Sequence, residues 1–510
     1  MNKQAEITND ANEKSENKPL YETYFASRKE NLPIIRISKI ELNGFKSVEH
    51  GTINLIPGKH SSEFFDIQPN ILGIYGQNGS GKTSLIQALA ILAYAMAGRT
   101  VDDTYTDCIS ARSGISTLAF SFDMQYLNGE TGVIDYSFSL EKVEMTIEEK
   151  RAEYEKNHRE PGDSFDESIF NDEPKYKIRI FNETVKISKN TANKKARHQT
   201  IVTTSGSSLP FGPNAKIQEL IGKNKDAKIR LEINRETTSS ESKSFIFSEK
   251  TLAIFVECGL APDYYEALLA LQYYAEKRLF VVDTRPYGLI GLNFLLPIHT
   301  DGECYLLASN RRRISVERYE KINNLLLSLS EVLSQLVPGL SIGFKKISET
   351  ILKNGKPGYL AVLVAKRGDL EIPLRDESDG VRKIISILGL IIAAYNDPSI
   401  TVAIDEFDAG IFEYLLGELL QSFEESGKGQ FIFTSHNLRP LEVIDKKFLV
   451  FTTTNENNRY YRFKDLSSSN NLRDRYFREL ILGGNDQEES LYNSTKRFKI
   501  ESAMRKVYKK

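Results

Sequence analysis

Residues 76–83 constrain the fold more than any other part of the chain. They have the sequence GQNGSGKT, which fits the pattern G-x-x-x-x-G-K-[ST] at every specified position. The apolar run at 71–75 predicts a strand before this segment, and residues 84–90 predict a helix after it. A strand, a glycine-rich loop and a helix in this order are typical of α/β proteins that bind phosphate with backbone N–H groups and a helix N-terminus.

This pattern predicts a nucleotide-phosphate site with a metal ion. In such a loop, the lysine reaches the β- and γ-phosphate oxygens, and the hydroxyl that follows it joins the shell of a Mg²⁺ ion. We therefore expect Thr83 to be a metal ligand as well as a phosphate contact. The predicted phosphate-binding residues are Gly76, Asn78, Gly79, Ser80, Gly81, Lys82, Thr83 and Ser84.

The length, charge and cysteine content of the chain limit the classes of protein to which it can belong. At 510 residues the chain is long enough for two or three structural units. Its 67 basic and 69 acidic residues give a net charge of −2, so contact with nucleic acid would need a local basic patch. Cys108, Cys258 and Cys304 are far apart in sequence and match no zinc or disulfide spacing. Free thiols are typical of a reducing compartment.

The chain carries no sequence signal for a membrane. Residues 1–29 are polar and lack the apolar core of a secretory signal. The longest apolar run, 384–394, is shorter than the about 20 residues that a membrane-spanning helix needs. We therefore expect a buried helix at 384–394, a cytoplasmic location and no membrane partner.

The order of patterned and polar segments predicts five regions. Alternating apolar residues predict strands in the first and last thirds of the chain, and charged, irregular segments lie between them. We divide the chain into a disordered N-terminal extension (1–30), an N-lobe with the phosphate loop (31–140), a mixed insertion of strands and helices (141–339), a C-lobe (340–465) and a basic C-terminal tail (466–510).

Several elements are predicted within these regions. In the N-lobe we expect strands at 35–42 and 51–56. A hairpin of 117–124 with 132–140 follows them. Further along, we expect an exposed basic loop at 186–198, amphipathic helices at 263–278 and 316–336, and hairpins around 354–355 and 368–369.

Two apolar segments in the C-lobe end in residues that suit nucleotide hydrolysis. The run 401–406 predicts a strand followed by Asp405 and Glu406, which could hold Mg²⁺ and polarise an attacking water, respectively. The run 430–437 predicts a neighbouring strand that ends near His436, from which this side chain could contact a γ-phosphate. We therefore predict Glu406 and His436 as catalytic residues and Asp405 as a metal ligand.

A second anion site is predicted just before the apolar helix. Ser378 and Gly380 open this helix, and a serine and a glycine at a helix N-terminus can bind an anion. In isolation, Ser378 has an alternative explanation as an ordinary helix N-cap.

Together these segments resemble the ATP-binding-cassette ATPases, in the branch with Rad50, SMC, RecF and the overcoming-lysogenization nucleases. The resemblance covers roughly 34–140 and 340–465. It implies an α/β ATPase head of two lobes around a P-loop core sheet, an α+β insertion and a short C-terminal tail. It also implies ATP and Mg²⁺ as cofactors.

The resemblance assigns roles to further residues. The segment 377–380 stands for the family's signature, although Asp379 replaces the first of its paired glycines, a change that bears on turnover rate more than on ATP binding. Asp408 stands for the D-loop residue and is implied as a nucleotide contact, as are Lys46 and Ser47 in the segment 44–47. Gln125 is a candidate for a metal-contacting glutamine or an ordinary strand residue.

The resemblance also implies partners, the first of which is the chain itself, in an ATP-sandwich dimer or a higher oligomer. In this family, ATP lies between two subunits, so Ser378 and Gly380 of one copy would face the γ-phosphate held by Lys82 of another. Arms like those of SMC and Rad50 are missing, and only 74 residues (510 − 436) follow His436, too few for a Toprim nuclease domain. We therefore expect an ATPase without a nuclease centre of its own.

In layout, the chain is most similar to the Septu-type PtuA ATPases of antiphage defence, including those encoded with retrons. The segments 377–383 and 433–437 carry this resemblance. It implies an HNH nuclease partner, PtuB, and in retron systems a reverse transcriptase with its msDNA. A RecF-like DNA-repair protein is the alternative, and a transporter cassette is disfavoured by the segment 45–47 and the long insertion.

Three basic segments could contact nucleic acid, although such runs are more often solvated surface. They are the loop 186–197, the cluster Arg311, Arg312 and Arg313, and the tail residues Lys496, Arg497, Lys499, Arg505, Lys506, Lys509 and Lys510.

Overall fold

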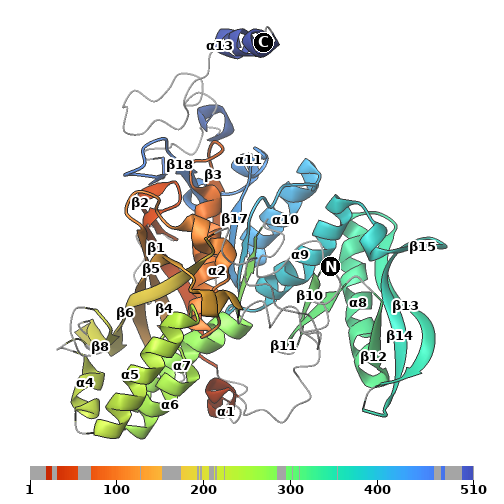
Figure 1. Ribbon diagram of the computed structural model, residues 1–510. Helices are drawn as coiled ribbons and strands as arrows, with labels where there is room; N and C mark the ends of the chain where they lie inside the picture. Colours follow the sequence, from red (N-terminus) through yellow and green to blue (C-terminus); the bar gives the residue numbers. More distant parts are fainter. Residues whose placement is uncertain are drawn as a thin grey trace.

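The computed structural model describes residues 19–25, 32–55, 70–126, 128–151, 174–191, 194–195, 198–205, 212, 215–222, 224–283, 295–300, 303–308, 311–352, 354–463, 472–476 and 497–508. Within these ranges the protein has a mixed α/β fold, as predicted, with two large sheets, a four-stranded sheet, a two-stranded sheet and helices around them (Figure 1).

The central sheet is mainly parallel and contains the strand that precedes the phosphate loop. Its strand order is β19-β18-β3-β17-β16-β9, and only β19 runs antiparallel to its neighbour. The strands are β3 (Asn70–Tyr75), β9 (Leu279–Val282), β16 (Thr401–Ile404), β17 (Gln430–Thr434), β18 (Leu449–Thr452) and β19 (Tyr460–Tyr461).

Both faces of this sheet are covered, as expected for parallel strands. Along β3, Leu72 and Ile74 belong to one hydrophobic core, whereas Ile71 and Tyr75 belong to the other. The first core includes α2 (Lys82–Met96) and α7 (Pro262–Lys277), and the second includes α9 (Asp379–Asn396) and α10 (Glu413–Ser426). Because two cores hold these strands, the loops at the strand ends rest on a rigid support.

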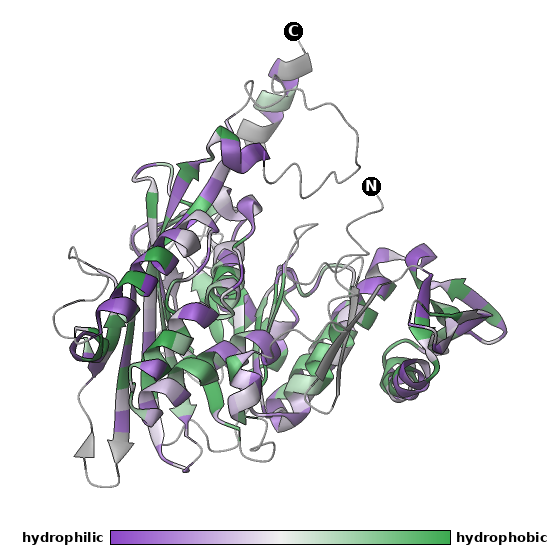
Figure 2. Ribbon diagram, turned by 60° about the horizontal axis from the view of Figure 1, so that its bottom comes forward, coloured by the Kyte–Doolittle hydropathy of each residue, from purple (hydrophilic) through white to green (hydrophobic). Residues whose placement is uncertain are grey.

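A second, antiparallel sheet covers the first core. Its order is β2-β1-β4-β5-β6-β7, and β8 pairs with β6. In Figure 2, apolar and polar residues are interspersed along these long strands, as expected when one face is buried. The strands are β1 (Ile34–Phe45), β2 (Val48–Asn54), β4 (Ile115–Gln125), β5 (Thr131–Glu144), β6 (Tyr176–Thr191), β7 (Lys194–Lys195) and β8 (Gln199–Thr203).

A four-stranded sheet with one long helix lies on the other side of the molecule (Figure 1). Its strands are β12 (Arg312–Ser315), β13 (Leu340–Ile351), β14 (Pro357–Arg367) and β15 (Leu370–Pro373), with helix α8 (Val316–Leu336) packed against them. The hairpins predicted at 354–355 and 368–369 join these strands. The pair β10 (Leu295–Thr300) and β11 (Glu303–Ala308) lies nearer the centre.

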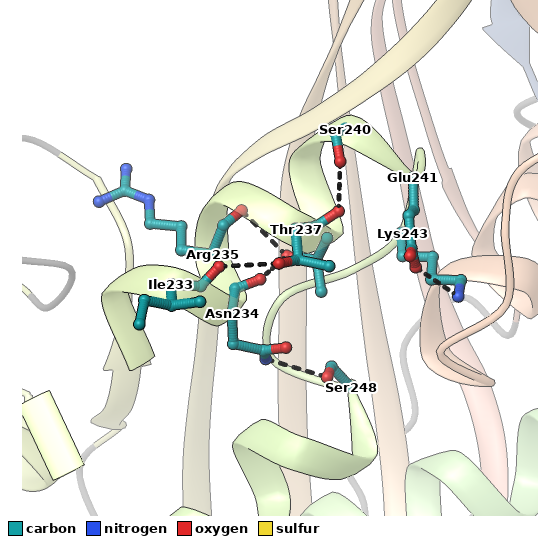
Figure 3. Close-up of polar contacts among 9 residues, drawn as sticks. Ile233, Asn234, Arg235, Thr237, Ser240, Glu241, Lys243 and Ser248 are labelled. Atoms are coloured by element: carbon teal, nitrogen blue, oxygen red, sulfur yellow. Dashed lines mark hydrogen bonds and ion pairs between the residues drawn. The ribbon is translucent and has the colours of Figure 1, made fainter. Parts of the chain in front are cut away.

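A group of helices lies beside the antiparallel sheet, and its polar side chains fix how the helices meet (Figure 3). Asn234 donates hydrogen bonds to Ser248 at 3.0 Å and to Thr251 at 2.7 Å, which ties one helix to the start of the next. The helices are α4 (Lys216–Ile221), α5 (Lys225–Ser240) and α6 (Glu249–Glu257).

The short elements lie at connections and at the chain ends. They are α1 (Leu20–Phe25), η1 (Asp103–Cys108), η3 (Leu374–Asp376), α11 (Pro440–Val443), η4 (Lys446–Phe448) and α13 (Arg497–Tyr508).

The structure differs from the sequence predictions at three places. Residues 20–25, inside the predicted disordered extension, form a helix because Tyr21 and Phe25 pack against Tyr273 of α7. The predicted basic loop 186–198 instead contains the end of β6, where Ile187 and Ser188 are buried between Lys186 and Lys189. Strand β9 lies in the predicted insertion but belongs to the central sheet; its four residues are too short for a clear pattern.

Candidate functional site

The candidate site lies where three parallel strands end. Strand β3 leads into the phosphate loop, β17 lies next to it and leads to His436, and β16 lies next to β17 and leads to Asp405 and Glu406. Because the strands are parallel, their carboxyl ends meet at one edge of the sheet, where α/β proteins bind ligands. The fold therefore places the strand ends that lead to His436 and Glu406 next to each other, as predicted.

The phosphate loop needs glycine at both of its ends. A Cβ atom on Gly76 would overlap the hydroxyl oxygen of Thr452, and a Cβ atom on Gly81 would lie 2.8 Å from Val48. Gly81 also has a φ of 99°, a conformation that other residues adopt at a cost. The backbone of the loop can therefore pass close to its neighbours and turn into α2.

Lys82 lies inside the loop. Its ammonium donates to the carbonyl oxygens of Gly76 at 2.8 Å and Gln77 at 3.0 Å, and the residue is only 6% exposed. Burial lowers the pKa of Lys82, while the nearby carboxylates, Asp405 first, oppose this shift. The cation therefore lies between the loop and the acidic end of β16.

The two predicted metal ligands lie side by side. The hydroxyl of Thr83 is 3.4 Å from Oδ1 of Asp405, which is fully buried. The hydroxyl of Thr434 donates to the same oxygen at 2.6 Å and accepts from the backbone N–H of Glu406 at 2.8 Å. A hydroxyl and an oriented carboxylate suit Mg²⁺, which is usually held by one or two protein oxygens together with phosphate and water.

Glu406 is exposed and has an unusual backbone. Its φ of 48° lies in the left-handed region, which is rare outside glycine and concentrates at functional sites. The ammonium of Lys383, on α9, donates to the Glu406 carbonyl oxygen. Burial lowers the pKa of Lys383 to about 8, with the carboxylates of Asp408, Glu406 and Asp405 opposing the shift.

His436 is exposed at the end of β17 and lies in the field of the other groups. Partial desolvation of its ring and the charge of Lys82 lower its pKa, whereas three carboxylates, Asp408 first, raise it. The carboxylate of Asp408 faces the residues that follow β17. It accepts hydrogen bonds from the backbone N–H groups of His436, at 3.1 Å, and Asn437, at 2.9 Å. Asp408 thus ties the end of β16 to the end of β17.

Ser378 caps α9, as the alternative explanation held. Its hydroxyl accepts from the N–H of Val381 at 3.4 Å, and its side chain is otherwise exposed. Gly380 lies against Gly410, where a Cβ atom would be 2.5 Å from the Gly410 carbonyl oxygen. Among the described residues, no hydrogen bond joins Ser378 or Gly380 to loop 76–84 of the same chain.

Lys46 and Ser47 form the turn between β1 and β2. Lys46 has a φ of 55°, and its ammonium donates to the side chain of Gln87 on α2 at 3.1 Å. The carbonyl of Ser47 accepts a hydrogen bond from Arg459. This turn is held against α2 and, through Arg459, near Gly81.

Gln125 lies at the opposite end of the antiparallel sheet from this turn. It pairs with Ile34 and Thr131, whereas Thr117, at the other end of β4, pairs with Asn43 near the turn. The distance along β4 from Thr117 to Gln125 is about 26 Å. Gln125 is therefore an ordinary strand residue, because its pairing places it at the end of β4 that is remote from the turn with Lys46 and Ser47.

The basic clusters lie outside this site. Arg311 and Arg313 are exposed at β12, while burial and the charge of Arg318 lower the pKa of Arg312. In the C-terminal tail, Arg505 and Lys506 are exposed on α13, which Figure 1 shows apart from the main body. Lys496, Lys509 and Lys510 lie outside the described residues.

Sequence reasoning missed three residues of this region. Lys383 lies on α9 directly before the apolar run predicted at 384–394, where a lysine next to isoleucines signals a buried charge. Thr434 is the last residue of a predicted strand, a position from which it reaches the neighbouring strand end. Arg459 follows a polar loop and carries no sequence signal.

This fold and this site are those of an α/β P-loop ATPase. The family described as AAA ATPase domain (AAA_15) matches residues 36–439, most of the chain. The chain belongs to this AAA ATPase family.

Solved structures of SMC head domains are similar in arrangement. An Smc head domain with a coiled coil and joint from Pyrococcus yayanosii is 13% identical, with 88% of this chain and 99% of that chain covered and a TM-score of 0.36. The SMC head domain from Thermotoga maritima is 13% identical, with 84% and 100% covered and a TM-score of 0.32. No curated protein matches the chain.

In the part of the chain that the structure describes, no helix is long and apolar enough to cross a membrane. The described residues also contain no group of three or more histidine, cysteine, aspartate or glutamate side chains placed to hold a metal ion.

Proposed function

We propose that the chain binds ATP with Mg²⁺ at the edge of the central sheet and hydrolyses it to ADP and phosphate. The observation that carries this proposal is the convergence of Lys82, Thr83 and Asp405, with the Thr83 hydroxyl 3.4 Å from Oδ1 of Asp405. In this proposal loop 76–84 holds the phosphates, and Thr83 and Asp405 hold the ion. The ion would neutralise charge that develops on the transferring phosphoryl group.

Glu406 and His436 are the proposed catalytic residues. An exposed carboxylate at the end of β16 can accept a proton from the attacking water. The lowered pKa of His436 favours its neutral ring, which can accept or donate a hydrogen bond at the γ-phosphate. Asp408 positions His436 by accepting from its backbone N–H.

We further propose that two copies complete each site, with Ser378 and Gly380 of one copy facing the nucleotide of the other. The exposure of Ser378 at the start of α9 supports this, because an exposed hydroxyl at a helix N-terminus can bind an anion from another chain. Lys46 and Ser47 are proposed as additional nucleotide contacts.

The proposed biological role is an ATPase subunit of a Septu- or retron-type antiphage complex. ATP-bound dimers would scaffold and restrain an HNH nuclease, PtuB, together with a reverse transcriptase and msDNA in retron systems. The resemblance of segments 377–383 and 433–437 supports this role. The exposed residues of the cluster 311–313 and of α13 are proposed nucleic-acid contacts.

One purification tests the role. Tagged protein with Glu406→Gln, which should retain ATP, is isolated from its native cells, with Lys82→Ala as the matched variant that cannot retain it. We expect an HNH nuclease, with or without a reverse transcriptase, to co-purify with Glu406→Gln. Dimers that require DNA and carry no nuclease would instead favour a RecF-like repair protein. DNA cleavage by the pure chain that survives Lys82→Ala would contradict the proposal.

A further inference from the structure

The connection between β18 and β19, residues 453–459, lies beside the phosphate loop although it comes late in the chain. Strand β18 pairs in parallel with β3, and Phe451 is the partner of Tyr75. The next residue after Phe451, Thr452, therefore lies beside the first glycine of the loop. The connection then returns antiparallel to β18, with Thr452 paired to Tyr460.

The two residues that flank this connection hold both ends of the phosphate loop. The hydroxyl of Thr452 donates to the carbonyl oxygen of Tyr75 at 3.1 Å and contacts the hydroxyl of Ser80. The hydroxyl of Tyr460 donates to the carbonyl oxygen of Gly81 at 2.9 Å. The connection is therefore attached to the loop through hydrogen bonds on either side.

Arg459 joins the connection to the β1–β2 turn. Its guanidinium donates to the carbonyl oxygen of Thr453, at 2.9 Å, and to that of Ser47. Its side-chain stem lies against the loop, with Cγ 3.3 Å from the position of a Cβ atom on Gly81. The residue is only 5% exposed.

The guanidinium of Arg459 has no carboxylate in direct contact with it among the described residues. Among the described residues, no acidic side chain lies within ion-pair distance of its guanidinium, and its Nε has no hydrogen-bond partner. The nearby carboxylate of Glu456 is 2.7 Å from Arg112 instead. Burial lowers the pKa of Arg459, and the charges of Glu456 and Tyr460 oppose this shift only in part, so the guanidinium bears a desolvation cost in this position.

We propose that Arg459 is a further phosphate-binding determinant of the nucleotide site, and that its fixed positive charge beside Gly81 favours ligands in proportion to their phosphate charge. A buried cation without an anionic partner is costly in the free protein, and a polyphosphate at the adjacent loop would reduce that cost. The inference rests on the proposed ATP binding. It concerns the affinity of the site and gives Arg459 no part in the chemical step.

The test compares ligands that differ only in phosphate number. Dissociation constants of ATP, ADP and AMP are measured by titration calorimetry for the wild type, Arg459→Met and Arg459→Lys. Met keeps an unbranched stem against Gly81 and removes the charge, whereas Lys keeps the charge. We expect Arg459→Met to raise the dissociation constant of ATP about tenfold and that of AMP about twofold, with ADP between them. Arg459→Lys should keep the wild-type ratio of the three.

Arg462→Met is the matched control. Arg462 is another arginine next to β19 and is partly buried, but its guanidinium donates to the backbone carbonyls of Asn54, at 2.8 Å, and Leu55, at 3.2 Å, rather than lying beside Gly81. We expect this variant to keep the wild-type ratio of the three affinities. Within one sample, the ratio of the dissociation constants of ATP, ADP and AMP does not depend on the fraction of folded protein. A loss of stability therefore cannot produce the graded change expected for Arg459→Met.

Two results would overturn the inference. An equal change for ATP, ADP and AMP in Arg459→Met would show a role in packing alone, and the same graded change in Arg462→Met would show that no charge beside Gly81 is needed. If the wild type binds none of the three, the proposed ATP site itself is wrong. That outcome differs from one in which all three nucleotides bind and Arg459→Met leaves the ratio of their dissociation constants unchanged, which would contradict only the role of Arg459.

Discussion

At the scale of single residues, the site depends on groups that hold its proposed reactive side chains in place. Thr434 contacts both carboxylate residues at the end of β16: its hydroxyl donates to Asp405 and accepts from the N–H of Glu406. Lys383 reaches the carbonyl of Glu406 from α9. These side chains set the position of Asp405 and Glu406 without being predicted to touch nucleotide.

Thr434→Val should impair hydrolysis mainly through the metal. Valine keeps the shape of the side chain and removes the hydrogen bond that orients Asp405, and loss of such a partner typically costs about 10–100-fold in metal affinity or activity. We expect the Mg²⁺ concentration for half-maximal ATPase activity to rise by about tenfold. Thr401→Val is the control, since Thr401 starts the same strand β16 and donates to Gln430. An unchanged Mg²⁺ requirement in Thr434→Val would contradict this role.

Lys383→Met should change how stability depends on pH. Because burial lowers the pKa of Lys383 from 10.5 to about 8, the unfolded chain binds a proton between these values that the folded chain has released. The contribution of this group to stability therefore rises with pH across the window, by no more than about 1.4 kcal/mol per pH unit, and its full cost remains below pH 8.

Urea unfolding at pH 8, 9 and 10 measures this effect. The free energy of unfolding of the wild type, relative to Lys383→Met, should rise with pH. Lys428→Met, at an exposed lysine, should run parallel to the wild type. A constant difference between the wild type and Lys383→Met would show that Lys383 is not held as a desolvated base.

At the scale of secondary-structure elements, one buried side chain joins the two large sheets. The register of β1 shifts between Ile37 and Lys39. At this irregularity the side chain of Gln430, on β17, accepts from the N–H of Ile37 at 2.8 Å and donates to its carbonyl oxygen at 2.9 Å. Gln430 is fully buried, and its side-chain amide satisfies the backbone N–H and carbonyl groups of Ile37 at the point where the register of β1 with β4 shifts.

Gln430→Leu should therefore destabilise the protein strongly. It leaves a buried N–H and a buried carbonyl without partners, at about 1–3 kcal/mol each, so we expect a loss of about 2–5 kcal/mol in the free energy of unfolding. Gln421→Leu, on the exposed side of α10, should change stability by less than about 0.5 kcal/mol. Denaturant unfolding measures both, and a loss below about 1 kcal/mol in Gln430→Leu would contradict the bridging role.

Elements with long periodic patterns could be predicted from the sequence, and short or tertiary ones could not. Helix α8 runs over Val316–Leu336, as predicted, because its apolar residues repeat over several turns. The basic end of β6 has the composition of a loop, because Lys186 and Lys189 flank Ile187, whose burial depends on pairing with β5 in the sheet. Strand β9 is too short for its own pattern to assign it to the central sheet.

The same distinction holds within the site. The phosphate loop, Asp405, Glu406 and His436 could be placed together, because a glycine pattern and parallel strand ends have few alternative arrangements. The engagement of Asp408 with the backbone of residues 436–437, and the position of Arg459 beside Gly81, depend on contacts between segments far apart in the chain. No local pattern encodes such contacts.

At the scale of the whole molecule, we propose that two chains complete each ATPase site. Within one chain, Lys82 is buried in its loop, whereas Ser378 is exposed at the start of α9. Each site of the proposed dimer would take Lys82 from one copy and Ser378 from the other. A substitution at either residue should therefore inactivate both sites of a uniform dimer.

Mixing two inactive variants tests this claim most directly. Lys82→Ala and Ser378→Arg are each expected to lack ATPase activity when purified alone. In an equimolar mixture, half of the dimers are mixed, and each mixed dimer has one site with both residues intact. We predict recovery of about one quarter of the wild-type ATPase activity, with a mass that corresponds to a dimer. A mixture that stays inactive, although the two variants are shown to associate, would contradict the account.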